Sequence, residues 1–96
     1  NVLMQTYVIL RRSVWKDRSE LEEAGDLARQ VADDELGGDV KWIRSYVLDE
    51  EDGTLGTVCI YQAEDEDILM EHAQRSDLPA DEIVAVVDTI MVRDDP

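Results

Sequence analysis

The sequence predicts an α+β fold whose elements follow the order β-α-β-β-α-β. Four segments alternate between polar and apolar residues or are rich in β-branched residues, and two segments show the apolar spacing of a helix. Between the second and third strands, Asp52 and Gly53 supply the positive φ that a tight hairpin needs. This order is that of the ferredoxin-like sandwich, in which two helices cover one face of a four-stranded antiparallel sheet.

The first half of the chain supplies one strand and one helix. The strand is expected over residues 4–12, where β-branched and aromatic residues alternate with polar ones. Ser19 and Glu22 have the spacing of a capping box, so the helix is expected to begin there. Gly37 and Gly38 follow the last apolar positions of the helix and are expected to end it.

The second half supplies three strands and the second helix. Residues 40–48 and 55–63 are expected to form the antiparallel hairpin. Asp65 is a favourable N-cap for the second helix, which is expected to end before Pro79. Residues 82–92 are expected to form the last strand. No repeat or linker interrupts this pattern, so residues 1–96 are expected to be a single ferredoxin-like domain.

The chain is strongly acidic. It carries 24 Asp and Glu against nine Lys and Arg, a net charge of −15, so it would repel nucleic acid and anionic membrane surfaces. Such a surface is typical of a halophilic protein from a salt-loving cytoplasm, and it could also gather divalent cations weakly. No apolar run reaches the roughly 20 residues of a membrane span, and the single Cys59 excludes an internal disulfide. We therefore expect a cytoplasmic protein with neither a nucleic-acid nor a membrane partner.

One face of the predicted sheet has no helix to cover it, and we call it the open face. Alternation along the second strand is expected to place Trp42, Arg44 and Tyr46 there, with Cys59 and Tyr61 beside them on the third strand. These side chains suit a cavity that holds a small molecule, and they equally suit the buried side of a homodimer. Both uses of the open face remain possible, including a dimeric α/β barrel with a ligand inside.

His72 is the only histidine in the chain and lies on the second helix. Imidazole nitrogen is a good ligand for transition metals, and its unperturbed pKa lies near neutrality. Its neighbours on the same helix face include no carboxylate, thiol or imidazole, so a metal at His72 would need ligands from another element or subunit. A half-buried imidazole bonded to a carbonyl, and an acid-base role, are the alternatives. Ser45, Cys59 and His72 have no spacing diagnostic of a catalytic triad, so no catalytic residue is assigned.

Four short motifs resemble a family of small, mostly uncharacterised prokaryotic proteins that includes a nickel-binding, nickel-responsive member. The resemblance extends from about Tyr7 to Val92. It is carried by residues 42–47 (WIRSYV), 59–66 (CIYQAEDE), 71–73 (EHA) and 78–80 (LPA), with matching positions at Trp42, Ser45, Tyr46, Cys59, Tyr61, Glu66, His72 and Pro79.

The resemblance implies a ferredoxin-like fold, homodimers and a divalent transition metal such as nickel, with His72 and Glu66 as its ligands. The acidic hairpin at residues 49–53 departs from the family pattern. The leading hypothesis is therefore a cytosolic homodimer that binds a metal, with no organic cofactor. The alternative is a cofactor-free dimeric α/β-barrel enzyme or small-molecule-binding protein that uses the open face.

Overall fold

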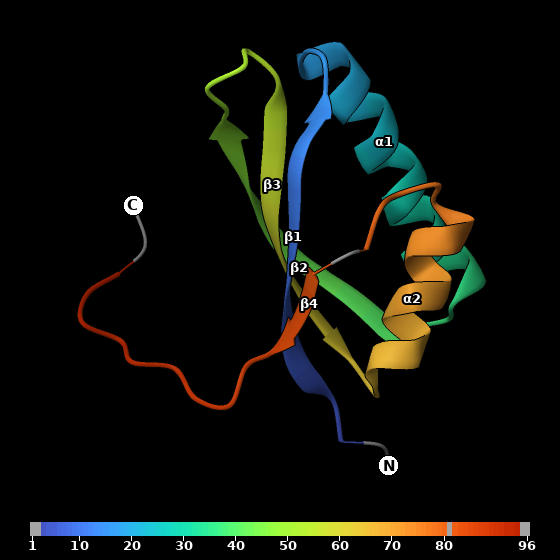
Figure 1. The fold of residues 1–96 in the computed structure, drawn as a ribbon. Coiled ribbons are helices and arrows are strands. Elements are labelled where there is room, and N and C mark those ends of the chain that lie inside the picture. The colour runs from blue at the N-terminus through green and yellow to red at the C-terminus, as the bar shows by residue number, and fades with distance from the viewer. Residues whose placement is uncertain (1–2, 81, 95–96) are drawn as a thin grey trace.

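The computed structural model describes residues 3–80 and 82–94 and confirms the predicted fold class (Figure 1). Its sheet has the order β2-β3-β1-β4 with antiparallel pairing throughout, and both α-helices lie on one side of it. Neither of these helices is long and apolar enough to cross a membrane. The elements are β1 (Gln5–Trp15), α1 (Arg18–Gln30), β2 (Val40–Asp49), β3 (Leu55–Ala63), α2 (Glu66–Arg75) and β4 (Glu82–Ala85).

The first helix begins two residues earlier than the predicted capping box. Asp17 is the N-cap, and its carboxylate accepts a 3.0 Å hydrogen bond from the backbone N–H of Glu20. The carboxylate of Glu20 reaches back to the backbone N–H of Lys16. The predicted cap at Ser19 is therefore wrong, because Asp17 and Glu20 have the same three-residue spacing and an acidic cap also suits the helix dipole.

The helical backbone ends before the two glycines, as predicted. α1 continues into a π-helical turn, η1 (Val31–Glu35), which is capped by Leu36. Gly37 and Gly38 then adopt φ values of 57° and 88°, which favour glycine because a Cβ is strained there. The second helix begins at the predicted N-cap, where the Asp65 carboxylate accepts from the N–H of Ile68.

A β-bulge in β2 changes which side chains share a face. Trp42 lies opposite Tyr61, but Arg44 lies opposite Ile60, so two residues of β2, Ile43 and Arg44, pass a single residue of β3. The alternation shifts by one residue at this point. Trp42 therefore points toward the helices, and not toward the open face as simple alternation predicts.

The last strand is shorter than the predicted range of 82–92. β4 pairs with β1 from Glu82 to Ala85, and the N–H of Val86 still donates to the carbonyl of Thr6 at 2.9 Å. β1 begins at Gln5, which the same register puts opposite Val87, so β1 has no residue to pair with the chain beyond Val87. Residues 86–94 belong to no strand or helix and extend away from the domain on the side opposite the helices (Figure 1).

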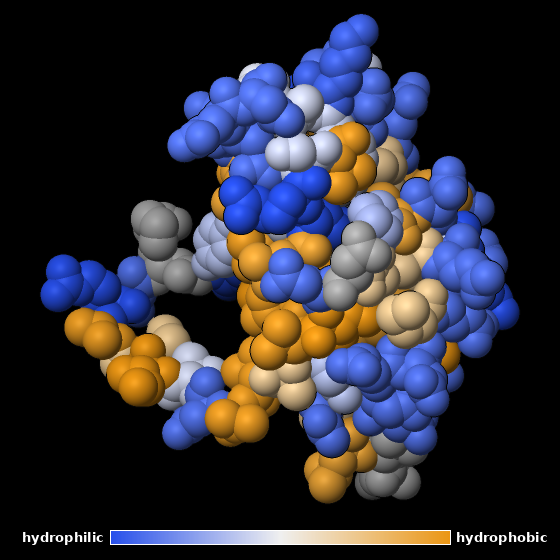
Figure 2. Space-filling view, in the orientation of Figure 1, coloured by the Kyte–Doolittle hydropathy of each residue, from blue (hydrophilic) through white to orange (hydrophobic). Residues whose placement is uncertain are grey.

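The core lies between the sheet and the helices. Burial of each large side chain there stabilises the fold by about 1.5–3 kcal/mol. The other sheet face carries apolar side chains that no helix covers, and Figure 2 shows apolar surface on the sheet body and on the projecting C-terminal segment. The core includes Tyr7, Ile9, Val31, Val40, Cys59, Tyr61 and Leu69. From here on, the open face denotes the outward side chains of Val8, Leu10, Tyr46, Val58, Ile60 and Val84.

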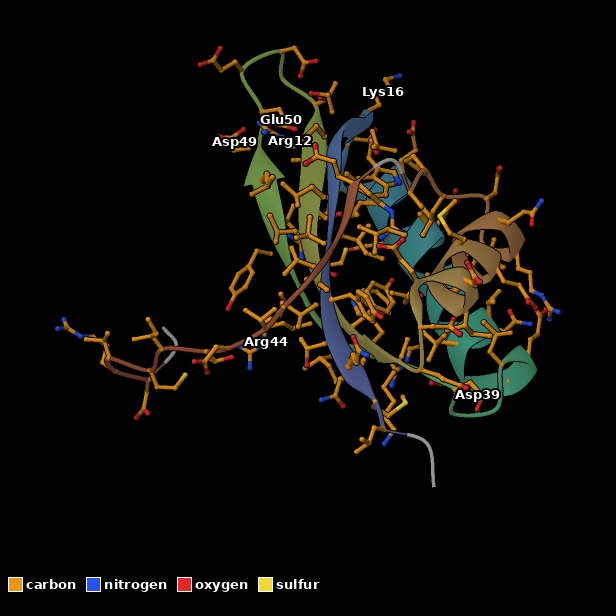
Figure 3. All side chains as sticks on the ribbon, turned by 60° about the horizontal axis from the view of Figure 1, so that its bottom comes forward. Arg12, Lys16, Asp39, Arg44, Asp49 and Glu50 are labelled. Atoms are coloured by element: carbon orange, nitrogen blue, oxygen red, sulfur yellow. The ribbon has the colours of Figure 1, made fainter. Side chains whose placement is uncertain are left out.

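An ion pair fixes the end of the sheet where the β2–β3 hairpin meets β1 (Figure 3). The Glu50 carboxylate accepts hydrogen bonds from the Arg12 guanidinium, the shortest at 2.7 Å, and from the N–H of Ser13 at 2.7 Å. Ser13 has a φ of 53°, and this bond holds it in that conformation. The hydrogen bonds from Arg12 lower the pKa of Glu50 below its usual value. Glu50, one of the acids of this hairpin, thus stabilises the end of the sheet.

Candidate functional site

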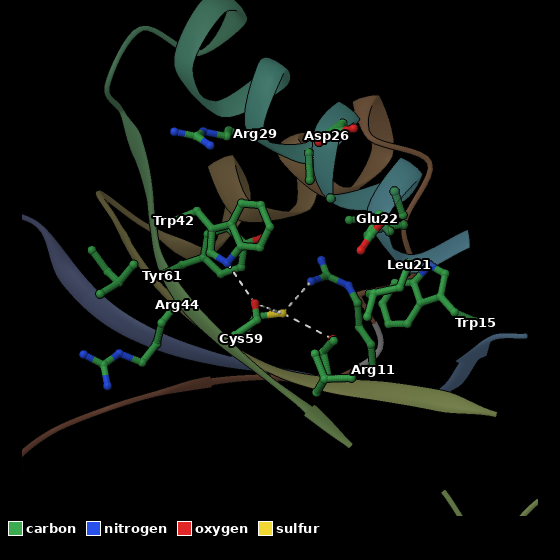
Figure 4. A pocket seen from close by; sticks show the side chains of 18 of the residues that line it. Arg11, Trp15, Leu21, Glu22, Asp26, Arg29, Trp42, Arg44, Cys59 and Tyr61 are labelled. Atoms are coloured by element: carbon green, nitrogen blue, oxygen red, sulfur yellow. Dashed lines mark hydrogen bonds between the residues drawn. The ribbon is translucent and has the colours of Figure 1, made fainter. Parts of the chain in front are cut away.

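A cavity of about 660 Å³ opens on the helix side of the sheet, beneath α1 (Figure 4). Its walls combine aromatic and aliphatic side chains with a few polar groups, as ligand sites do. α1 lies close to the sheet here, since a Cβ at Gly25 would lie 3.6 Å from the Trp42 ring. The lining includes Leu21, Glu22, Asp26 and Arg29 from α1, Arg11 and Trp15 from β1, Trp42 and Ser45 from β2, and Thr57, Cys59 and Tyr61 from β3.

Arg11 is a buried cation inside this cavity, with 2% of its surface exposed. Its Nε donates to the carbonyl of Pro79 at 2.6 Å, and its Nη1 contacts the Cys59 sulfur at 3.5 Å. Its Nη2 is buried without a hydrogen-bond partner, and no carboxylate pairs with Arg11 in the described part of the chain. A buried polar group left unpaired costs about 1–3 kcal/mol, and a charged one costs more. Arg11 is thus suited to receive an anion.

Cys59 accepts and donates hydrogen bonds in a short chain of polar side chains on the cavity floor. The indole N–H of Trp42 donates to Ser45 Oγ at 2.8 Å, and the Ser45 hydroxyl donates to the Cys59 sulfur at 3.0 Å. The thiol in turn donates to Thr57 Oγ1 at 3.3 Å. The Cys59 sulfur contacts no imidazole or carboxylate among the described residues. These hydrogen bonds therefore orient Trp42, and they supply no base that could activate the Cys59 thiol as a nucleophile.

Two stacked aromatic rings form one wall. The rings of Trp42 and Tyr61 lie 6.2 Å apart at an angle of 13°. Burial raises the pKa of Tyr61 to about 12, although the charge of Arg11 opposes this shift. The phenol therefore stays neutral at physiological pH, and Arg11 remains the positive group at the cavity floor.

His72 lies beneath the helices, with none of its surface exposed. Its Nε2 lies 2.9 Å from the carbonyl of Ala28, so Nε2 carries the proton and donates, while Nδ1 is buried without a partner. The ring packs edge-on against Tyr61. Burial lowers the pKa of His72 below 6.5, and the charge of Arg11 acts in the same direction, whereas the Ala28 carbonyl opposes it. His72 is a neutral core residue in this arrangement.

The described residues do not assemble a nickel site around His72. They contain no group of three or more His, Cys, Asp or Glu side chains placed to hold a metal. Glu66 lies on the exposed first turn of α2, and six residues of helix place it about 120° around the axis from His72. The predicted ligand pair is thus not brought together, and the buried Nδ1 of His72 has no second ligand beside it.

The five side chains predicted for the open face divide between the two sides of the sheet. Trp42, Cys59 and Tyr61 line the cavity on the helix side, which differs from the predicted face. Tyr46 lies on the open face as predicted. Arg44 also points outward, where its Nη1 donates to the Tyr46 hydroxyl at 3.2 Å, and it borders the cavity rim.

Sequence reasoning missed Arg11, although a signal was present. Arg11 follows Tyr7 and Ile9 at two-residue spacing, and all three side chains point to the helix side. A charged residue in the register of core positions has to be paired or bound to something.

Comparison with known proteins identifies the family. The chain resembles the crystal structure of SCO4226 from Streptomyces coelicolor A3(2), with a TM-score of 0.71 and 17% identity, over 88% of this chain and 99% of that one. This likeness concerns the fold. No curated protein matches the sequence significantly. Residues 7–86 match the sequence model of the family described as nickel responsive protein SCO4226-like. The chain therefore belongs to the SCO4226-like family of nickel-responsive proteins.

Proposed function

We propose that this protein binds a small organic carboxylate in the cavity beneath α1. The observation that carries the proposal is the buried Arg11, which lines the cavity and whose Nη2 has no hydrogen-bond partner. A carboxylate would satisfy this donor through a charge-assisted hydrogen bond, the strongest type available to a guanidinium. The stacked rings of Trp42 and Tyr61 would pack against the apolar body of the same ligand.

The charges around the cavity favour a small ligand over a polyanion. Glu22, Asp26 and Asp33 stand at the rim, and the whole chain carries a charge of −15. These charges repel an extended anion such as a nucleic acid, whereas a single carboxylate can pass the rim and reach Arg11. The cavity lies on the helix side of the sheet, whereas the sequence predicted a ligand site on the open face.

Tryptophan fluorescence offers a direct test, because both tryptophans of the chain, Trp15 and Trp42, line the cavity. Phenylacetate serves as the probe and phenylacetamide as its neutral counterpart. We expect phenylacetate to bind at least roughly tenfold more tightly, since a hydrogen bond to a charged group contributes about 1.5–3 kcal/mol.

Variants locate the interaction. Arg11→Met should abolish the preference for phenylacetate, and Arg11→Lys should keep part of it. Arg75→Met removes the same charge from α2, outside the cavity lining, and should leave binding unchanged. Equal phenylacetate affinity in folded Arg11→Met and in the unaltered protein would remove Arg11 from the site; circular dichroism verifies folding.

Nickel binding is the second candidate function, and the description of the family supports it. His72 and Glu66 remain the proposed ligands, because His72 is the only imidazole and its Nδ1 has no partner. It ranks second because the described residues supply no three-ligand group. Calorimetric titration with nickel tests it: His72→Ala and Glu66→Gln should each weaken binding, and unchanged affinity in both would exclude this pair.

A homodimer formed through the open face completes the proposal. Val84 and Tyr46 on this face are 51% and 44% exposed, and Val8, Leu10 and Ile60 are only partly buried. An apolar sheet face of this kind is usually covered by another protein surface. A second copy would cover it while leaving the cavity, on the opposite side of the sheet, accessible.

A further inference from the structure

Residues 87–92, which we call the C-terminal arm, expose their apolar side chains almost completely. Val87 is 96% exposed, Ile90 87%, Met91 72% and Val92 77%. Large apolar side chains grouped in this way mark an interaction surface. The arm is also rich in β-branched residues, which favour extended backbone.

The arm has no place in the sheet of its own chain. The register of β4 on β1 puts Ala85 opposite Tyr7, and β1 begins at Gln5. The last backbone hydrogen bond between them joins Val86 to Thr6. Beyond this point β1 offers only Gln5, opposite Val87, so the apolar residues at 90–92 have no partner in β1 and remain exposed where a strand was predicted.

The arm leaves the domain on the same side as the open face. Figure 1 shows it extending away from the sheet in the direction opposite the two helices. Val84, on the strand that leads into the arm, belongs to the open face and is 51% exposed. Val87 thus continues the apolar residues of β4 into the arm, and Asp88 and Thr89 separate it from Ile90, Met91 and Val92.

The arm also lies outside the part of the chain that matches the family, which ends at residue 86. A contact made by the arm would therefore involve residues outside those that match the family model.

We propose that the C-terminal arm of each copy packs on the open face of a second copy, so that two chains exchange arms reciprocally. This inference rests on the proposed homodimer. A second copy fits better than an unrelated protein, because the chain itself carries both complementary surfaces, the exposed arm and the uncovered face. A two-fold axis brings both pairs of surfaces together at once and leaves neither exposed.

Sedimentation equilibrium separates the arm from the dimer itself. A triple variant, Val87→Ser, Ile90→Ser and Val92→Ser, should raise the dimer dissociation constant at least about tenfold. Leu3→Ser is the control, because Leu3 is also 88% exposed and lies outside the arm. A monomeric unaltered protein would overturn the homodimer and the exchange together. A dimer with the same dissociation constant in the triple variant would overturn the exchange alone.

Mixed-copy NMR tests where the arm lies. A spin label is attached to Ile90→Cys in unlabelled chains that also carry Cys59→Ala, and these are mixed with ¹⁵N-labelled Cys59→Ala chains. Exchange predicts that the label broadens the amide signals of β1 and β3 in the ¹⁵N-labelled copies. Broadening that appears only when label and ¹⁵N share one chain would show that the arm folds back on its own domain, and would overturn the proposal.

Discussion

His72 bonds to the carbonyl oxygen of Ala28 at 2.9 Å and so ties α2 to α1 across 44 residues of sequence. The bond lies in the core, where the His72 ring also packs against Tyr61. Although His72 is the residue that a metal site would use first, its position makes it a structural link between the two helices. Two measurable consequences follow from this link.

The first consequence is a loss of stability when the ring is removed. We expect His72→Ala to lower the free energy of unfolding by about 2–4 kcal/mol, because it removes a buried hydrogen bond and leaves a cavity beside Tyr61. Urea denaturation measures this change. A loss below about 0.5 kcal/mol would contradict the buried position of the ring.

The second consequence is a pH dependence. Burial lowers the pKa of folded His72 below 6.5, so the unfolded chain takes up a proton in a range where the folded chain does not. Stability should therefore fall as the pH decreases below 6.5 toward the lowered folded pKa. His72→Gln should flatten the stability profile between about pH 6.5 and 5, above the range in which most carboxylates titrate. Parallel profiles for the two proteins would contradict this.

Glu50 is expected to matter more than its neighbour in the same acidic hairpin. Glu50 holds Arg12 and the N–H of Ser13, whereas Glu51 is exposed. The pKa of Glu50 is lowered from 4.5, so the stability that it contributes is present above pH 4.5 and is lost as the pH falls below that value. Glu50→Gln should lower the melting temperature at pH 7 by more than Glu51→Gln, as differential scanning calorimetry can measure.

Two glycines should respond to alanine in opposite directions. A Cβ at Gly56 would lie 2.5 Å from the Glu50 carboxylate and 2.6 Å from the backbone carbonyl of Arg11, and the backbone cannot move aside cheaply. A Cβ at Gly25, inside α1, would make an ordinary contact with Trp42. We expect Gly56→Ala to destabilise the protein by about 1–3 kcal/mol and Gly25→Ala to stabilise it by about 0.5–1 kcal/mol. Denaturant melts of both variants decide the signs.

The proposed dimer face can be tested with a matched pair of charges. Val84 on the open face and Met70 on α2 are 51% and 50% exposed. Val84→Glu should shift the protein toward the monomer, because a buried carboxylate in an apolar interface lacks a partner. Met70→Glu adds the same charge elsewhere and should leave the assembly unchanged. Light scattering after size exclusion measures both, and equal masses for the two variants would argue against this face.

The sequence predicted the fold well because local signals determine it. The third strand, Leu55–Ala63, and the cap at Asp65 are where alternation and cap chemistry placed them. The prediction of the last strand was wrong beyond Ala85, because the length of β4 depends on where its partner β1 begins. The composition of residues 82–92 does not show where the partner strand begins.

The candidate site was harder to predict. Trp42, Cys59 and Tyr61 were recognised, but their face was assigned by strict alternation, which fails at the bulge next to Ile43. Arg11 was missed because its burial depends on helices that pack over β1. The face of the sheet on which a side chain lies depends on the pairing register, which is a property of two strands together.

The bulge at Ile43 also decides what the Trp42 ring can be used for. With the extra residue, Trp42 and Ser45 share a face and the indole joins the cavity wall. If β2 kept Ile43 but paired with β3 without a bulge, regular alternation from Ser45 backward would turn the indole to the opposite side of the sheet, where it would enlarge the surface offered to another copy. A single bulged residue in an edge strand thus keeps one large aromatic ring in the cavity wall and off the face that we propose for assembly.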